Sequence, residues 1–188
     1  MRLLKLMPGG AESAHGCRGC KRRNAPRGTG TRSESGSEPG SQHGGKKQNK
    51  RRLDLVLATG HLSSEECLML IREAKRQGVR HMVVTHAMMA PIHMKIPQMR
   101  EAAEMGAYIE FVYNGLIGPY KEFDFADYAK AIRAVGVESC ILASDLGQVV
   151  NPVHPEGLKA YFAGLRQQGI SEDEIARMSQ TNPASLFQ

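Results

Sequence analysis

The sequence lacks tryptophan entirely, and phenylalanine and tyrosine bring its aromatic content to only 5%. It also lacks any apolar run close to the ~18 residues of a membrane-spanning helix. The apolar start, MRLLKLMPGG, is broken at Pro8 before it reaches the ~7–15 residues of a secretory signal. We therefore expect a cytoplasmic protein without a membrane partner.

Cysteine is scarce, with four residues in a chain of 188. Cys17 and Cys20 have the spacing of a zinc-binding pair, but a closed zinc site needs four ligands and no second pair follows. Cys67 and Cys140 stand alone inside apolar segments, where cysteine usually packs as a small buried side chain. The pattern disfavours both a zinc site in the first segment and a disulfide framework.

Positive charge is confined to one end of the chain. Residues 1–52 hold 13 Lys and Arg against 3 Glu, whereas residues 53–188 hold 12 against 16 acidic residues. The first segment has no Ile, Val, Phe, Tyr or Trp, so it has little apolar surface to offset the entropy of folding. We predict that residues 1–52 are a disordered, basic, low-complexity tail whose removal leaves stability unchanged.

The basic run KKQNKRR in this tail could contact nucleic acid, but a solvated charged run is the more common case. The remainder of the chain is mildly acidic, so it carries no electrostatic signal for nucleic acid. We expect no nucleic-acid partner beyond the basic tail.

From residue 53 onward, apolar runs alternate with amphipathic segments. Ser63 with Glu66, and Ser171 with Glu174, form capping boxes that mark the starts of two helices. Four strand-then-helix units in succession are typical of parallel strands joined by right-handed crossovers, and they predict an α/β fold. The predicted strands are residues 53–59, 80–85, 108–114 and 139–144, and the predicted helices are residues 63–78, 97–106, 124–136, 155–169 and 171–180.

A polar residue stands at the carboxyl end of each predicted strand: His61, His86, Asn114 and Asp145. In parallel α/β folds the active site is built at that edge of the sheet. Two imidazoles and one carboxylate form a common divalent-metal set that suits Zn, Mn or Fe. The alternative is that each is an ordinary loop or capping residue, and the spacing alone leaves both readings open.

Other polar residues carry weaker signals. His81 begins a strand at the opposite edge, where it is expected to serve stability. His93 and His154 lie in loops on the active side, where most imidazoles are simply solvated. Glu110 lies within a strand, so its carboxylate must be paired or face a polar centre, which makes it a candidate to support a neighbouring ligand.

The segments TGHLSSEE, VVTHAMM, ASDLGQVVNP and TNPASLF, in this order and spacing, resemble the amidohydrolase superfamily of metal-dependent hydrolases, in particular a bacterial branch of it. The resemblance runs from about residue 53 to the C-terminus. The superfamily fold is a (β/α)₈ barrel of the TIM type, which typically needs ~250 residues. The resemblance therefore implies that residues 53–188 form half of such a barrel, with the four strands corresponding to strands five to eight.

By this resemblance, His61, His86 and Asp145 are metal ligands, and Asp145 also takes the proton of a metal-activated water. The implied reaction is hydrolysis of an amide, ester or related bond in a small-molecule substrate, with zinc first and manganese or iron as alternatives. The superfamily's His-x-His pair occurs nowhere in this sequence, nor does its bridging lysine or acid. We therefore expect a truncated, impaired hydrolase; the alternative is a non-catalytic half-barrel that holds no metal.

Four parallel strands leave two open sheet edges that a closed barrel would not have. The inward-facing side chains, which we expect to include Val56, Val84 and Ile141, would then lack the opposing half of the barrel core. We expect the chain to self-associate as a homo-oligomer.

Overall fold

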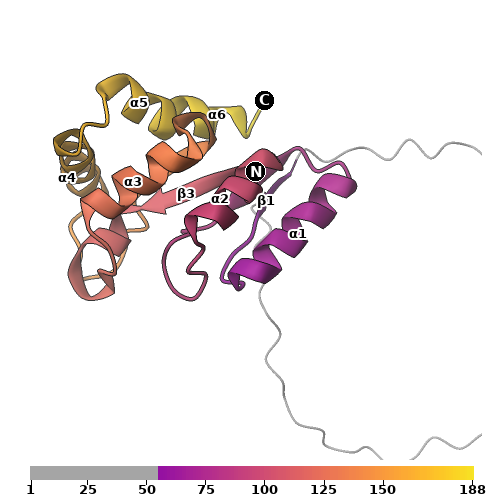
Figure 1. Ribbon diagram of the computed structural model, residues 1–188. Helices are drawn as coiled ribbons and strands as arrows, with labels where there is room; N and C mark the ends of the chain where they lie inside the picture. Colours follow the sequence, from indigo (N-terminus) through magenta and orange to yellow (C-terminus); the bar gives the residue numbers. More distant parts are fainter. Residues whose placement is uncertain (1–54) are drawn as a thin grey trace, which may run out of the picture. The chain divides into compact units, whose positions relative to one another are not determined.

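The computed structural model describes residues 55–188. Strands and helices alternate along this part of the chain, as the sequence predicts (Figure 1). The predictions for residues 1–52, including the basic tail and the zinc-like pair, lie outside the described residues. The elements are β1 (Val56–Ala58), α1 (Ser64–Arg76), β2 (His81–Val84), α2 (Ile96–Glu104), β3 (Ala107–Val112), α3 (Phe125–Val135), β4 (Cys140–Ala143), α4 (His154–Gln167), α5 (Glu172–Ala176) and α6 (Asn182–Ser185).

The four strands form one sheet in the order β1-β2-β3-β4, and every neighbouring pair is parallel. This arrangement confirms the α/β fold with parallel strands. Within the described residues, β1 and β4 each have a single neighbour, so the sheet is open on both sides. Nothing in this part of the chain closes the sheet into a barrel.

Helix starts follow the predicted capping boxes. The Ser63 backbone N–H donates to Glu66 Oε2 at 2.9 Å, and the Glu66 N–H donates back to Ser63 Oγ. The same reciprocal pair joins Ser171 and Glu174 at the start of α5. Each pair provides acceptors for backbone N–H groups at the start of the helix, which have no partner inside it.

The last predicted helix is interrupted. Where the sequence predicts one helix over residues 171–180, the chain forms α5, a π-helical turn over Arg177–Thr181, and then α6. Pro183 lies at the start of α6 and has no N–H to donate to the carbonyl four residues earlier. A π-helical turn next to a proline accommodates this missing hydrogen bond.

The main core lies between the sheet and the helices that follow the strands. Side chains of alternate strand residues, such as Val84, Ile109 and Phe111, pack there against helical residues such as Ile71 and Tyr161. All five are at most 1% exposed. Among residues 55–188, no helix is long and apolar enough to cross a bilayer.

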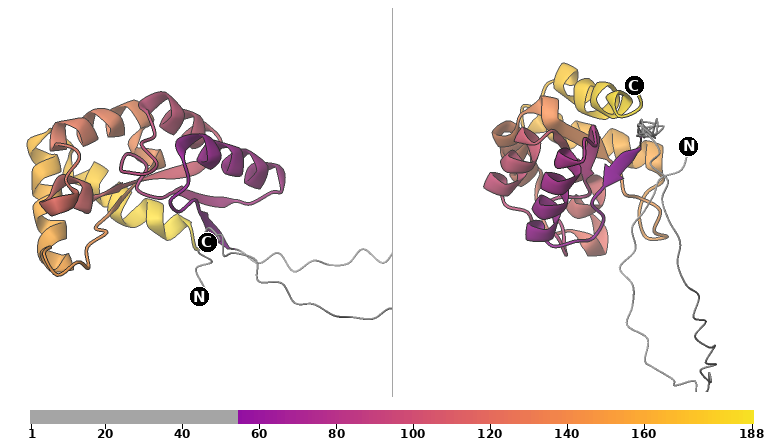
Figure 2. Two further views of the ribbon diagram at one scale, coloured as in Figure 1. Left: turned by 90° about the horizontal axis from the view of Figure 1, so that it is seen from below. Right: turned by 90° about the vertical axis from the view of Figure 1, so that its right-hand side faces the viewer.

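The opposite face of the sheet is partly covered by the C-terminal helix. Leu186, just after α6, packs with Val83 and Ile141, and Figure 2 shows α6 on the other side of the strands from α1 and α2. The expectation that Val84 faces this side is wrong: the parallel register places Val83, not Val84, beside Tyr108 on that face, and Val84 is fully buried under the helices. Val56 and Ile141 do face this side, as predicted, but Ile141 is only 6% exposed because Leu186 packs against it.

Both described cysteines are buried and unpaired, as the sequence indicates. Burial raises the pKa of the Cys140 thiol to about 12, and the nearby Glu138 charge adds to the shift. The thiolate is the reactive form, so we expect Cys140 to resist iodoacetamide at pH 8 in the folded protein and to react fully in denaturant. Peptide mass spectrometry after timed alkylation would measure this, and fast modification of native Cys140 would contradict it.

Candidate functional site

Polar residues gather at the carboxyl edge of the sheet, as the sequence predicts. His61 follows β1, His86 follows β2, Asn114 follows β3, and Asp145 follows β4. Because the strands are adjacent and parallel in sequence order, these four residues stand along one edge. The rings of His61 and His86 lie with their centroids 4.8 Å apart, tilted by 36°.

His86 is the most constrained of these residues. Its side chain is only 8% exposed, and its Nδ1 atom is buried without a hydrogen-bond partner among the described residues. Its backbone has φ of 28°, in the left-handed region that non-glycine residues rarely adopt. An orphaned polar atom and a strained backbone at one residue are both typical of functional sites.

Glu110 in β3 holds the His86 backbone. Glu110 Oε2 accepts the His86 N–H at 2.9 Å, and the Glu110 carbonyl accepts the Ala87 N–H at 3.1 Å. Burial raises the pKa of the Glu110 carboxyl, the His86 N–H lowers it in part, and the Asp145 charge raises it further. The expectation that this mid-strand carboxylate is paired is therefore confirmed, and its support of a metal ligand stays a prediction.

Asp145 is also held by its neighbours. Asn114 Nδ2 donates to Asp145 Oδ2 at 3.3 Å, and Asn151 Nδ2 donates to Asn114 Oδ1 at 2.8 Å. The Asn114 N–H donates to the Ser144 carbonyl, which joins the ends of β3 and β4. Asp145 itself has φ of 48°, so a second residue of the edge occupies the left-handed region.

The loops after β1 and β2 are joined in the same way. The Thr85 N–H donates to Thr59 Oγ1, and the Gly60 N–H donates to Thr85 Oγ1, each at 3.2 Å. Together with the bonds around Glu110 and Asn114, these contacts link all four strand ends into one hydrogen-bonded row. The row fixes where His61, His86 and Asp145 stand relative to one another.

The electrostatics of the edge favour a neutral His86. Burial lowers the pKa of His86, and the neighbouring His61 lowers it further, while the charge of Asp145 acts in the opposite direction. A neutral imidazole presents a free nitrogen lone pair, which is the form that binds metal ions. The orphaned Nδ1 and the donor types at this edge therefore fit a divalent metal.

The ligand set is nevertheless incomplete in this arrangement. Within residues 55–188, no three His, Cys, Asp or Glu side chains lie close enough together to hold a metal ion. His61 and His86 meet, whereas the Asp145 carboxylate is bonded to Asn114.

The remaining candidate histidines lie apart from this row. His93 Nε2 pairs with Glu122 Oε2 at 2.8 Å, which ties the loop after β2 to the loop after β3. His154 is the first residue of α4 and is exposed, and His81 begins β2 at the opposite edge. Sequence reasoning missed Asn151, whose role in orienting Asn114 depends on a contact between residues far apart in the chain.

In the comparisons with known proteins, part of the chain matches a family whose activity is not known. Residues 50–110 match a family of unknown function (DUF6282). The match covers β1, α1, β2 and α2 and ends within β3, so it includes His61, His86 and Glu110 but not Asp145. No curated protein and no solved structure matches the chain.

Proposed function

We propose that this chain carries the site of a metal-dependent hydrolase of the amidohydrolase type, in an impaired form. In this proposal its four strands correspond to strands five to eight of a (β/α)₈ barrel. The observation that carries it is the buried Nδ1 of His86, which has no hydrogen-bond partner among residues 55–188. This nitrogen lies beside the His61 ring and on the same sheet edge as Asp145.

In this proposal the two histidines bind the metal and Asp145 accepts a proton. His61 and His86 would hold a divalent metal, zinc first and manganese or iron as alternatives, and such a metal lowers the pKa of a bound water and polarises the scissile bond. Asp145 is exposed, and its carboxylate can accept a proton from water. Asn114 orients the Asp145 carboxylate, and Glu110 fixes the His86 backbone.

Two observations support impairment. The sequence contains no His-x-His pair, which by the resemblance supplies further ligands. The described part of the chain also brings no three ligand side chains together. The second observation favours the alternative function, a non-catalytic half-barrel, in which the same edge serves binding alone.

Zinc titration of the full chain by calorimetry tests the proposal. We expect one weakly bound Zn²⁺ per chain, and we expect His86→Asn to lower the affinity about tenfold or more because it removes the buried nitrogen ligand. His154→Asn is the matched control, because His154 is an exposed histidine outside the row. An unchanged affinity in His86→Asn would contradict the proposed site, and no zinc binding by the wild-type chain would favour the non-catalytic alternative.

Hydrolysis assays test the expected impairment. We expect negligible turnover of amide and ester substrates by the zinc-loaded chain, because too few protein ligands hold the metal in a defined position. Metal-dependent hydrolysis that Asp145→Asn abolishes would show that the site is competent after all, with Asp145 as its base.

A further inference from the structure

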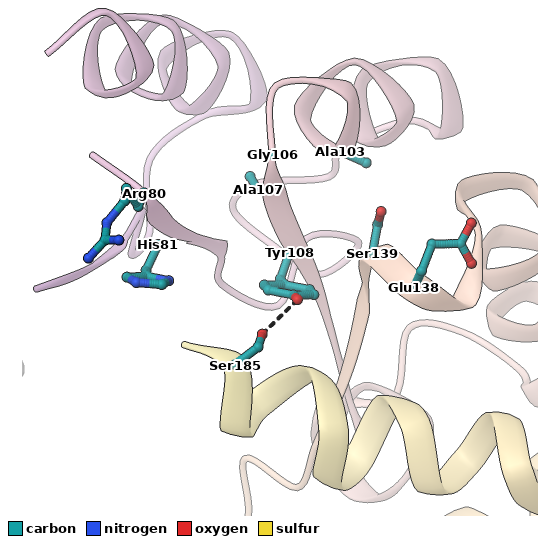
Figure 3. Close-up of a pocket in the computed structure, with 9 residues that line it drawn as sticks. All are labelled: Arg80, His81, Ala103, Gly106, Ala107, Tyr108, Glu138, Ser139 and Ser185. Carbon is teal, nitrogen blue, oxygen red and sulfur yellow. Dashed lines mark hydrogen bonds between the residues drawn. The ribbon is translucent and has the colours of Figure 1, made fainter. Parts of the chain in front are cut away.

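A pocket of about 340 Å³ lies at the edge of the sheet opposite the candidate site, where β2, β3 and β4 begin. At its centre Tyr108 OH lies 2.8 Å from Ser185 Oγ (Figure 3). Ser185 Oγ donates to the Asn182 carbonyl at 2.7 Å, so the Tyr108 hydroxyl donates to Ser185. Figure 3 shows the Glu138 carboxylate turned away from this pair. The two hydroxyls join α6 to β3, which is a structural role.

The loop after β4 has a feature that folding does not explain. The Asn151 N–H donates to the Gln148 carbonyl at 3.0 Å, which closes a β-turn with Val149 and Val150 at its two central positions. Val149 is fully exposed and Val150 is 70% exposed. Glycine, proline, asparagine, aspartate and serine normally occupy such positions. The two apolar, β-branched residues therefore do not serve the formation of the turn.

The valines do not anchor the loop to the core either. Leu146 packs into the main core and is only 6% exposed, so it supplies that anchor. Val149 and Val150 belong to neither hydrophobic cluster of residues 55–188, nor does Val153, which is 62% exposed. Apolar side chains that are grouped at one exposed place and break a local rule are typical of a surface that contacts a ligand.

Both ends of this turn are hydrogen-bonded to the candidate site. Gln148 Nε2 donates to the Asp145 carbonyl at 3.3 Å. Asn151 Nδ2 donates to Gln148 Oε1 at 2.7 Å and to Asn114 Oδ1 at 2.8 Å, and Asn114 in turn donates to the Asp145 carboxylate. These bonds close a ring through the four residues. The turn, with the two valines at its tip, therefore has a fixed position beside Asp145.

We propose that Val149 and Val150 determine the substrate preference of the candidate site by binding an aliphatic chain. The inference rests on the proposed function, and it makes the substrate an aliphatic amide or ester. Ligand sites commonly combine a few polar groups that fix orientation with apolar surface that provides affinity. Here the polar groups lie along the strand ends, and the turn adds apolar surface next to them. The valines offer methyl groups without a ring or a charge, which fits an aliphatic chain better than an aromatic or charged group.

Titration of the full chain with acetate, butyrate, hexanoate and octanoate tests this inference, followed by the NMR signals of the valine methyl groups. These acids are products of aliphatic amide or ester hydrolysis, and a carboxylate also binds zinc. We expect the affinity to rise about twofold with each added methylene, half of the ~fourfold effect of a fully buried methylene, because an exposed turn covers one side of the chain. Octanoate should shift the methyl signals of Val149 and Val150.

The same titrations with saturating zinc separate this inference from the proposed function. Zinc should raise the affinity for all four acids alike, because the carboxylate then binds the metal. Equal affinities for acetate and octanoate would overturn the inference and leave the metal site standing. A rise with chain length that zinc does not affect would support the apolar contact and contradict the metal site.

A double variant, Val149→Ser with Val150→Ser, tests the assignment to the turn. Serine is common in turns, so the variant should fold as wild type does. Its affinity for octanoate should fall to that for acetate. Met69→Ser, at an exposed apolar residue of α1, is the matched control and should keep the rise with chain length. A rise that survives in the double variant would show that the turn does not bind the chain.

Sedimentation analysis of the same proteins tests whether a second copy covers the valines instead. We expect the double variant and the wild-type chain to have the same oligomeric state. If the double variant dissociates an oligomeric wild-type chain, and the four acids bind with equal affinity, the turn is a contact between copies and the inference is wrong.

Discussion

Tyr161→Ala is expected to lower the free energy of unfolding by about 3–5 kcal/mol, the usual cost of removing a buried aromatic ring. Tyr161 in α4 is fully buried. Its ring stacks on Tyr113 with centroids 5.3 Å apart and lies near Phe125 and Tyr128. Its hydroxyl donates to the Phe111 carbonyl at 3.1 Å, so the residue joins α4 to the carboxyl-terminal part of β3.

Urea denaturation followed by circular dichroism measures this effect, with Tyr161→Phe as the matched control. The phenylalanine variant keeps the ring and loses only the bond to Phe111, so its cost should be about 1–2 kcal/mol. The alanine loss is large against the ~5–15 kcal/mol by which a typical domain is stable. A cost below 1 kcal/mol for Tyr161→Ala would show that this aromatic cluster does not form the core.

The strands and helices follow from signals that act over short distances in the chain. Ser63 and Glu66 are three residues apart, and their capping box places the start of α1 where the sequence predicts it. Isolated apolar runs likewise predict the four strands, although β1 is shorter than its run. Local hydrogen bonds and side-chain periodicity determine these features, so one sequence is enough to find them.

Features that depend on contacts between distant segments were not predicted. The position of α6 across the second face of the sheet depends on Leu186 packing with Val83 and Ile141. The incorrect assignment of Val84 has the same origin, because a shift of one residue moves a strand side chain to the other face. The sequence pattern alone does not establish that register.

In the candidate site, too, some features follow from local sequence and others depend on contacts between distant segments. His61, His86 and Asp145 each come just after a predicted strand of a parallel sheet. This position predicts that all three lie at the carboxyl edge of the sheet. The bonds that fix them, such as Asn151 to Asn114 across 37 positions in the sequence, leave no local signal. The buried Nδ1 of His86 could not be anticipated either, since it depends on how closely the neighbouring loops pack.

Glu110→Leu is expected to weaken zinc binding by about tenfold or more, although Glu110 is not itself an assigned ligand. Leucine has no acceptor for the His86 N–H, which Glu110 Oε2 now binds at 2.9 Å. The His86 backbone, with φ of 28°, would then be free to relax toward an ordinary conformation and carry its ring away from His61. Leaving that buried N–H unpaired should also cost about 1–3 kcal/mol of stability.

Glu110→Gln tests whether residue 110 acts through its hydrogen bond to His86 or through its negative charge. Its amide oxygen can still accept the His86 N–H, so zinc affinity should stay within about threefold of wild type, the ordinary scatter of such effects. Because burial raises the pKa of Glu110 above its ordinary value of 4.5, ionisation of this carboxyl opposes folding as the pH rises. The glutamine variant should therefore match wild type at pH 4 and become progressively more stable than it toward pH 8. Zinc calorimetry at the higher pH measures the first effect, and urea melts at both pH values measure the second. Equal loss of zinc affinity in the leucine and glutamine variants would assign the effect to the charge of Glu110 instead of its hydrogen bond to His86.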